Sequence, residues 1–329
     1  MDANCSVSTE KEKIAVAAFV GDIHYRTSTP EYRIEKSDFH KVINNKLREM
    51  FGKIESFEAY THIPIFVAGD MFDKARDFLS FWNLAGALQE YDYPGTIYVV
   101  PGQHDQFHHN QNDTCTSLNA LSEYRPCNIQ ILSGTPLERV IKAPGGWNFF
   151  GCGWGEEYLE APEGDKNVLI THRSLWHNKP IYPGQTEGNV VVETLRMKQK
   201  GYCYAFSGDN HKAFDVKMNG VSLFNLGAFT RNNVDLAKQQ PRFCVLFDDG
   251  SVESFSVGER DVFEMERSDD DKERAEKQDE FSSALAGGFA HTATFKQKLE
   301  EIVAVGECGE LKLNEEQRSL LRDVVNEID

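Results

Sequence analysis

The sequence predicts an α/β fold, a four-layer α-β-β-α sandwich with a short helical appendage at the C-terminal end. Three observations lead to this prediction. In the first hundred residues, apolar runs of strand length alternate with helical segments, an order that implies a parallel sheet with right-handed crossovers. Further along the chain, strand-length runs recur with fewer long helices between them. Both β-rich halves have flanking helices, which favours two sheets that pack face to face and are covered on their outer sides.

The first sheet is expected from three apolar runs that each end in polar residues. They are residues 13–24 (KIAVAAFVGDIH), 62–70 (HIPIFVAGD) and 95–105 (GTIYVVPGQHD). The two segments between these runs, 37–57 and 78–91, are predicted helices. In the first helix, the apolar residues recur at helical spacing: Phe39, Ile43, Leu47, Phe51 and Ile54.

The second sheet is expected from three further runs of the same kind. They are residues 167–175 (NVLITHRSL), 201–211 (GYCYAFSGDNH) and 221–229 (VSLFNLGAF). Residues 242–257 predict a β-hairpin, because Asp249-Gly250 is a favoured hairpin turn between two apolar segments.

The chain divides by composition into a polar tail at 1–13, a domain at 14–258 and an acidic linker with an appendage at 259–329. Two short amphipathic helices are predicted within 290–329. The tail lacks the apolar core of a signal peptide, and no apolar run approaches the roughly 20 residues that span a bilayer. A cytoplasmic protein without membrane contact is therefore expected.

The formal net charge is −17, which by itself does not suggest a nucleic-acid partner. The acidity is uneven, because residues 259–329 contain 20 acidic and 10 basic residues and so account for −10 of the total. Bound cations would neutralise several of the remaining acids, so DNA binding is not excluded. The seven cysteines are odd in number and form no CxxC pair, which argues against a disulfide framework or a zinc ribbon.

Side chains able to bind metals or carry protons follow five of the predicted strands. They are Asp22 and His24, Asp70, the Gln103-His104-Asp105 run, His172, and Asp209 with His211. The carboxyl ends of parallel strands meet at one edge of a sheet, so these residues are expected to converge. A glycine precedes Asp22, Asp70, Gln103 and Asp209, where it is expected to let the chain turn tightly.

The chemistry of this set fits two divalent ions. Carboxylate, imidazole and amide donors suit manganese, iron or zinc, and no soft sulfur ligand is present in the motifs. Two ions about 3.5–4 Å apart can clamp a phosphate, generate hydroxide and stabilise the leaving oxygen, provided that one carboxylate bridges them. Each motif alone is commonly structural, but five in this order form a joint signal.

These motifs resemble the series of the calcineurin-like metallophosphoesterases, D-x-H, G-D, G-N-H-D, H and G-H-x-H. Here they are GDIH, AGD, GQHD, LITHRS and SGDNH, and the resemblance covers about residues 14–258. Within that superfamily, the chain is most similar to SbcD-type DNA repair nucleases, especially phage-encoded relatives. The similar stretches are VVPGQHD…TSLNALSEYRPCNIQIL and ITHRSLWHNKPIYPGQ…GYCYAFSGDNHKAF.

The resemblance implies a ligand set for each of two ions. One ion would be held by Asp22, His24, Asp70 and His211, and the other by Asp70, Gln103, His172 and Asp209. Asp70 would bridge the two. His104 would be the proton donor or stabiliser of the transition state, and Asp105 would orient it. Mn²⁺ is the expected metal, with Mg²⁺, Fe²⁺ or Zn²⁺ as alternatives.

Two positions depart from the usual pattern of this family. Gln103 stands where asparagine is usual, and Asp209 stands where the first histidine of G-H-x-H is usual. Both changes fall on the second ion, where they would either harden the site toward manganese or magnesium or loosen it. His108 and His109 match no motif and are expected either to line a substrate groove or to be exposed loop residues.

The leading hypothesis is a DNA exo- or endonuclease subunit of SbcCD type in DNA repair, recombination or phage DNA processing. The resemblance implies an SbcC-like coiled-coil ABC-type ATPase as partner, docked through residues 290–329 unless these are a simple packing appendage. A homodimer is also expected, and the host cytoplasm is the location if the protein is phage-encoded. Six basic residues near the motifs would favour DNA: Arg26, Arg33, Lys36, Arg173, Lys179 and Lys212.

Two alternatives remain at this point. The first is a phosphodiesterase or phosphatase for a small or cyclic nucleotide or a phosphoprotein, since the same metal core serves all of these. The second is a non-catalytic nucleic-acid-binding module whose second metal site has degraded. A small closed pocket would favour the first alternative, and the absence of metal-dependent hydrolysis would favour the second.

Overall fold

The computed structural model describes residues 13–30, 33, 38–111 and 113–258, and the backbone of 307–308 and 311–312. The first sheet contains β1 (Ala15–Val20), β2 (Ile65–Ala68), β3 (Ile97–Val100), β4 (Ile129–Ile131), β11 (Arg242–Phe247) and β12 (Val252–Ser256). The second contains β5 (Val140–Ala143), β6 (Trp147–Cys152), β7 (Asn167–Thr171), β8 (Tyr204–Ser207), β9 (Phe214–Met218) and β10 (Val221–Asn225). The helices are α1 (Phe39–Glu55), α2 (Phe78–Tyr91), α3 (Ser117–Tyr124) and α4 (Val190–Gln199), with 3₁₀ turns η1 (Phe107–His109), η2 (Pro144–Gly146) and η3 (Val234–Leu236).

The first sheet has the strand order β12-β11-β1-β2-β3-β4. Strands β1 to β4 are parallel, which confirms the β-α-β-α-β prediction, and β11 joins β1 antiparallel. The predicted hairpin is β11–β12, with Gly250 in the left-handed region at φ 81°. The carboxyl ends of β1, β2 and β3 therefore lie at one edge.

The second sheet has the order β5-β6-β7-β8-β10-β9. Its four inner strands are parallel, while β5 and β9 are antiparallel edge strands. Thr171 at the end of β7 pairs with Ser207 at the end of β8, so the residues that follow these two strands emerge side by side.

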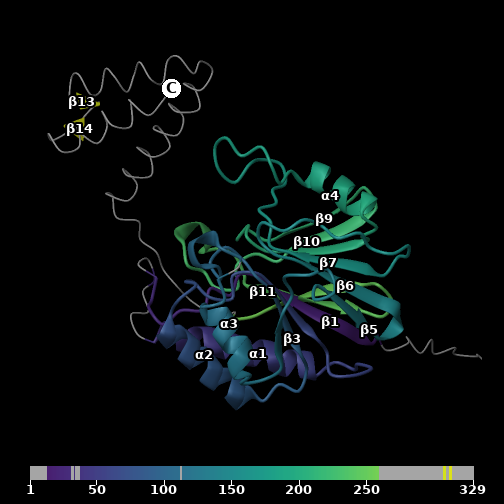
Figure 1. Ribbon diagram of the computed structural model, residues 1–329, viewed down its shortest axis with the longest axis horizontal. Coiled ribbons are helices and arrows are strands. Elements are labelled where there is room, and N and C mark those ends of the chain that lie inside the picture. The colour runs from purple at the N-terminus through teal and green to yellow at the C-terminus, as the bar shows by residue number, and fades with distance from the viewer. Residues whose placement is uncertain are drawn as a thin grey trace, which may run out of the picture. The chain divides into compact units, whose positions relative to one another are not determined.

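Buried side chains of the strands and helices form three apolar clusters. Figure 1 shows α1, α2 and α3 beside one sheet and α4 beside the other. Along β1, Ala18 and Val20 face α1 and α2, whereas Phe19 faces the second sheet. The five periodic apolar residues of α1 are buried, as their spacing predicted. On the far side, α4 covers the second sheet through Val190 and Met197. The four-layer α-β-β-α architecture is thus confirmed.

Aromatic rings hold the two sheets together. The ring of Phe19 stacks on that of Phe206 with 3.5 Å between centroids, and Phe66 stacks on Phe149 at 4.7 Å. All four side chains are at most 1% exposed, and burying each one contributes about 1.5–3 kcal/mol relative to exposure. This contact fixes the carboxyl edges of the two sheets against each other.

The chain divides into two units, Met1–Lys179 with Thr186–Met265, and Pro180–Gln185 with Glu266–Asp329. In the second unit, the described backbone includes strands β13 (Glu307–Cys308) and β14 (Leu311–Lys312), which pair antiparallel. The first of the two predicted C-terminal helices, residues 294–309, included Glu307 and Cys308, so the prediction was wrong at these two positions. The rest of the predicted C-terminal helices, and the 1–13 tail apart from Lys13, lie outside the described residues.

The sequence did not reveal several elements of the domain, namely α3, α4, β4, β5, β6 and β9. Within the described segments, no helix combines the length and apolarity needed to cross a bilayer. The five cysteines whose side chains are described are free thiols.

Candidate metal centre

The seven residues predicted as ligands come together at the carboxyl edge of the two sheets. Asp22 and His24 follow β1, Asp70 follows β2, Gln103 follows β3, His172 follows β7, and Asp209 and His211 follow β8. Backbone pairing continues past the strand ends, because the His24 amide donates to the Asp70 carbonyl at 2.9 Å. The Asp209 amide donates to the Asp22 carboxylate at 2.9 Å, which ties the two sheets together at this edge.

The acids at this edge hold unusual backbone conformations. Asp22, Asp70 and Asp209 have φ values of 41°, 46° and 71°. A non-glycine residue in this left-handed region costs roughly 1–2 kcal/mol, and such strain concentrates at functional sites. The hydrogen bonds between the strand-end segments, from His24 to Asp70 and from Asp209 to Asp22, hold the three aspartates in this conformation despite its cost.

The glycines before these residues act differently from the expectation. Of the four, only Gly69 has a left-handed φ, at 89°. Gly102 instead permits a close approach, because a Cβ there would lie 2.1 Å from Asp70 Oδ1. The tight turn is made by the aspartates themselves, and the missing side chain at Gly102 lets the GQHD turn reach Asp70.

The first group of donor atoms comes from Asp22, His24 and His211. One donor atom from each lies within 4.8 Å of the others, and the Nε2 atoms of the two histidines are 3.0 Å apart. Burial lowers the pKa of His24 to about 3, against the opposing charge of Asp70. Burial also lowers the pKa of His211. Both imidazoles are therefore neutral near pH 7, the form that binds a metal.

Asp70 lies between this group and a second one. Its Oδ1 accepts a hydrogen bond from the His104 amide at 2.9 Å. Its Oδ2 is 3.6 Å from His24 Nε2 and 3.3 Å from His172 Nε2. Burial would raise the pKa of Asp70, but the charges of His172 and His24 lower it below its usual value. An ionised carboxylate thus occupies the position that the bridging prediction requires.

The second group consists of His172, Gln103 and Asp209. His172 Nε2 lies 3.3 Å from Asp70 Oδ2 and 3.8 Å from Asp209 Oδ1. His172 Nδ1 lies 2.7 Å from the Ala68 carbonyl, to which it donates, so Nε2 faces the carboxylates. Gln103 Nε2 donates to Asp209 Oδ1 at 2.7 Å. The two residues that depart from the usual family pattern are therefore bonded to each other.

Electrostatics and unsatisfied donors both fit divalent cations at this edge. Asp22, Asp70 and Asp209 each place an oxygen within 3.9 Å of the His172 ring. Burial alone would lower the pKa of His172. The negative charges of Asp70 and then Asp22 outweigh burial and raise this pKa to about 10. Within the described part of the chain, four buried side-chain atoms of the predicted ligands lack a hydrogen-bond partner: His24 Nδ1, Asp70 Oδ2, Gln103 Oε1 and His172 Nε2. Buried polar atoms are normally paired. A cation would satisfy the two oxygens, and it would take the place of the proton on His172 Nε2.

His104 and Asp105 follow Gln103 in the GQHD turn, and a ring nitrogen of His104 lies within 4.8 Å of ligand atoms of His24 and Asp70. His104 is exposed, its ring is 4.9 Å from that of His24, and its Nδ1 lies 2.8 Å from the Asp73 carbonyl. Asp105 is buried and accepts from the amides of Gly102, Met71 and Phe72 at 3.0–3.2 Å. Burial, and then Asp70, raise the pKa of Asp105 to about 7.

The orientation of His104 thus comes from a residue that the sequence did not single out. Among the described contacts, Asp105 bonds to the backbone of the turn, whereas the Asp73 carbonyl meets the His104 imidazole. Asp73 lies three residues beyond Asp70 in the AGDMFD segment, and its carboxylate also bonds to Arg26 at 3.3 Å. The proximity of Asp73 to the motif was the available signal.

The basic residues near the motifs differ in their availability. Arg33 is only 3% exposed, and Lys36 lies outside the described residues. Arg26 bonds to Asp73, and Arg173 lies 3.7 Å from Glu193. Lys212 has a side chain that is 67% exposed and 3.7 Å from Asp235, and Lys179 is exposed.

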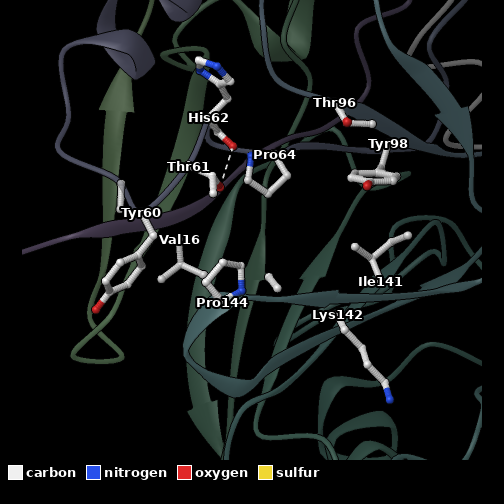
Figure 2. A pocket seen from close by; sticks show the side chains of 12 residues that line it. Val16, Tyr60, Thr61, His62, Pro64, Thr96, Tyr98, Ile141, Lys142 and Pro144 are labelled. Atoms are coloured by element: carbon white, nitrogen blue, oxygen red, sulfur yellow. Dashed lines mark hydrogen bonds between the residues drawn. The ribbon is translucent and has the colours of Figure 1, made fainter.

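A hollow of about 200 Å³ lies at the opposite edge, near the amino ends of β1, β2 and β3 (Figure 2). Val16, Pro64, Tyr98 and Ile141 are among the residues that line it. In Figure 2, the ammonium end of Lys142 points away from its middle. None of the residues predicted for the metal centre lines this hollow.

Several solved structures are similar to this chain at low sequence identity. One is an archaeal phosphodiesterase (12% identity, 73% of this chain and 98% of the other, TM-score 0.40). Another is a phosphopantetheinyl hydrolase of Mycobacterium tuberculosis (12%, 74% and 96%, TM-score 0.42). A 5′-nucleotidase precursor of Thermus thermophilus is a third (11%, 84% and 60%, TM-score 0.41).

No curated protein sequence matches the chain significantly. The sequence model of the calcineurin-like phosphoesterases matches residues 16–213, a span that includes every residue predicted for the metal centre and for proton transfer. This chain belongs to the calcineurin-like phosphoesterase family.

Proposed function

We propose that this metal-dependent phosphoesterase cleaves phosphodiester bonds in DNA, as the nuclease subunit of an SbcCD-type system. One observation carries the dinuclear part of the proposal. A single buried oxygen, Asp70 Oδ2, lies within 3.6 Å of imidazole nitrogens from both donor groups and accepts no hydrogen bond from any described residue. The exposed imidazole of His104 has a ring nitrogen within 4.8 Å of an oxygen of the same Asp70 carboxylate.

The ligand roles follow from the two donor groups. Asp22, His24 and His211 would hold one ion and Gln103, His172 and Asp209 the other, with Asp70 shared. When bound, the ions would supply a hydroxide at neutral pH and neutralise charge on the phosphate. The second group favours Mn²⁺ or Mg²⁺ over Zn²⁺, because the Asp209 carboxylate stands where the family pattern has a histidine nitrogen.

His104 is assigned proton donation to the leaving oxygen. Its Nδ1 proton is directed to the Asp73 carbonyl, which leaves Nε2 to carry the proton that is transferred. A deoxyribose alkoxide is a poor leaving group, so a donor at this position contributes strongly to cleavage. Asp105 keeps the turn that carries His104 in position through its three backbone hydrogen bonds.

A DNA substrate is supported by the resemblance to SbcD-type nucleases and by the exposed cations Lys179 and Lys212 near the motifs.

We further propose that an SbcC-like ATPase docks through residues 290–329, which lie outside the described residues apart from β13 and β14. Truncation near Ser268 should then abolish co-purification with that partner while hydrolysis of a small phosphodiester persists. An unfolded core after truncation would contradict the docking role. A homodimer and a cytoplasmic location belong to the same proposal.

One observation favours a small phosphodiester instead. Two of the arginines near the motifs, Arg26 and Arg173, are already engaged by acids, and Arg33 is buried. Few cations therefore remain for a long phosphate backbone. A cyclic nucleotide would need fewer of them, so a phosphodiesterase for small nucleotides is the second candidate.

The deciding experiment incubates the full-length protein and Mn²⁺ with labelled single- and double-stranded DNA, with cyclic nucleotides in parallel. Asp70→Asn is the matched control, because any hydrolysis that survives it comes from a contaminant. Metal-dependent DNA cleavage that this substitution removes supports the nuclease. Cleavage of cyclic nucleotides alone would support the second candidate, and DNA binding without any hydrolysis would show a binding module.

A further inference from the structure

The turn that follows the GQHD motif is strained and carries two exposed imidazoles. His108 and His109, in η1, have φ values of 52° and 56°, so two consecutive non-glycine residues lie in the left-handed region. L-residues rarely adopt this conformation, because Cβ then lies too close to the following carbonyl oxygen. Neither histidine belongs to the donor groups described above. A conformation of this kind persists only where surrounding contacts enforce it, and such turns are commonly functional.

Contacts on both sides of the turn enforce it. The Arg76 guanidinium lies 3.5 Å from the centre of the Phe107 ring and is itself fixed by the Cys115 carbonyl and the Asp113 carboxylate, each at 2.8 Å. On the other side, the His109 ring lies 5.0 Å from that of Trp154 at an interplanar angle of 35°. The rings are thus held in place while the imidazoles remain exposed to solvent.

We call His108, His109 and Trp154 the rim. The rim adjoins the candidate metal centre. The Trp154 amide donates to the Pro101 carbonyl at 2.9 Å, and Pro101 begins the turn that carries Gln103 and His104. Trp154 also lies two residues beyond Cys152, which pairs with Thr171, the residue before His172. The segments that carry His109 and Trp154 therefore adjoin the GQHD turn and the strand end before His172.

We infer that His109 and Trp154, with His108 beside them, bind an unpaired nucleobase of the substrate strand by stacking. The inference rests on the proposed nuclease function. Stacking on an aromatic side chain contributes roughly 1–3 kcal/mol per base and tolerates any sequence, because every base has a π-face. The rim thus gives the enzyme an affinity for single-stranded nucleotides that does not depend on additional cations, which are scarce at this edge.

The test compares two substrates and measures binding separately. For His109→Ala, kcat/KM for a single-stranded oligonucleotide should fall about 5- to 160-fold more than that for bis-nitrophenyl phosphate, the range that 1–3 kcal/mol predicts. His109→Phe, which keeps a flat ring, should recover most of the loss. Tyr60→Ala, which removes an exposed ring at the opposite edge, is the control.

An abasic substrate provides the matching change on the DNA side. The wild type should lose a similar factor when the bases next to the scissile phosphate are removed, and His109→Ala should then lose little more. Equal losses on the oligonucleotide and the small ester would overturn the inference, as would a full effect of His109→Ala on abasic DNA. Oligonucleotide binding, measured by fluorescence anisotropy, decides the case without cleavage. If the wild type binds the oligonucleotide more tightly than His109→Ala but hydrolyses none, only the proposed nuclease activity is refuted. If the wild type and His109→Ala bind it equally well, base stacking on His109 and Trp154 is refuted.

Discussion

The two edges of the sandwich differ in what their side chains leave unsatisfied. At the carboxyl edge, strained aspartates crowd around His172, and four buried atoms of the predicted ligands have no hydrogen-bond partner among the described residues. At the amino edge, a hollow of about 200 Å³ is present, but none of its lining residues carries such an atom. Convergent polar atoms, rather than volume, mark the functional edge of this fold.

The largest expected effect comes from Asp70, the residue shared by both donor groups. Asp70→Asn removes the charge that links them, so hydrolysis of bis-nitrophenyl phosphate should fall at least about 10³-fold, the equivalent of several kcal/mol of charge stabilisation. Titration calorimetry should show that affinity for both ions is lost. Asp235→Asn, an exposed acid near Lys212, serves as control. One ion retained at full affinity would show that Asp70 does not bridge.

His104 should give the next largest effect. His104→Ala should keep both ions, while DNA cleavage falls about 10²–10⁴-fold, the usual contribution of a general acid. Hydrolysis of bis-nitrophenyl phosphate should fall less, because nitrophenolate leaves without a proton. Parallel rate measurements on the two substrates, with metal content recorded, test this. Equal losses would indicate stabilisation of transition-state charge instead, and loss of metal would make His104 a ligand.

A smaller effect is expected from restoring the usual family residues at the second group. Asp209→His should shift preference from Mn²⁺ toward Zn²⁺ by about 10- to 100-fold, since a nitrogen replaces a charged oxygen. Because Gln103 bonds to Asp209, adding Gln103→Asn should change this shift non-additively. Competitive titration of the two metals is the measurement. A parent protein that already binds zinc more tightly than manganese at both positions would contradict the argument.

The smallest effect is expected at the amino edge. Lys142→Ala, beside the hollow, should change the free energy of unfolding by no more than about 0.5 kcal/mol. It should leave hydrolysis and metal affinity as they are. Urea denaturation and the bis-nitrophenyl phosphate assay check both. A marked loss of activity would mean that the hollow communicates with the metal centre, and the contrast between the two edges would fail.

The fold could be predicted where local pattern and tertiary role agree. The apolar runs that became β1, β2 and β3 end in motif residues, and α2 spans the predicted 78–91. Helix α4 was not predicted from the sequence because its first residues are three β-branched valines, which favour strands. Two of them, Val191 and Val192, are about half exposed, so its apolar pattern does not mark one buried face.

For the candidate site, motif order predicted which residues converge, because strand ends in a parallel sheet share an edge. It did not reveal how they contact one another. The bond between Gln103 and Asp209 joins residues 106 positions apart, and the contact between His104 and the Asp73 carbonyl involves a backbone atom that no side-chain pattern encodes. The glycine prediction was wrong at three of four positions because sequence cannot separate a turn from a close approach.

The position of Asp70 between ligands from both sheets links the metal supply to folding. His24 and His211, which lie 187 positions apart, would be joined through one ion, and His172 through the other. Ligands that bind only the folded chain stabilise it, so each tenfold excess of free ion over its dissociation constant adds about 1.4 kcal/mol to the unfolding free energy. The sandwich would therefore act as a sensor of divalent-metal availability, with its lifetime in the cell set by the same ions that its chemistry uses.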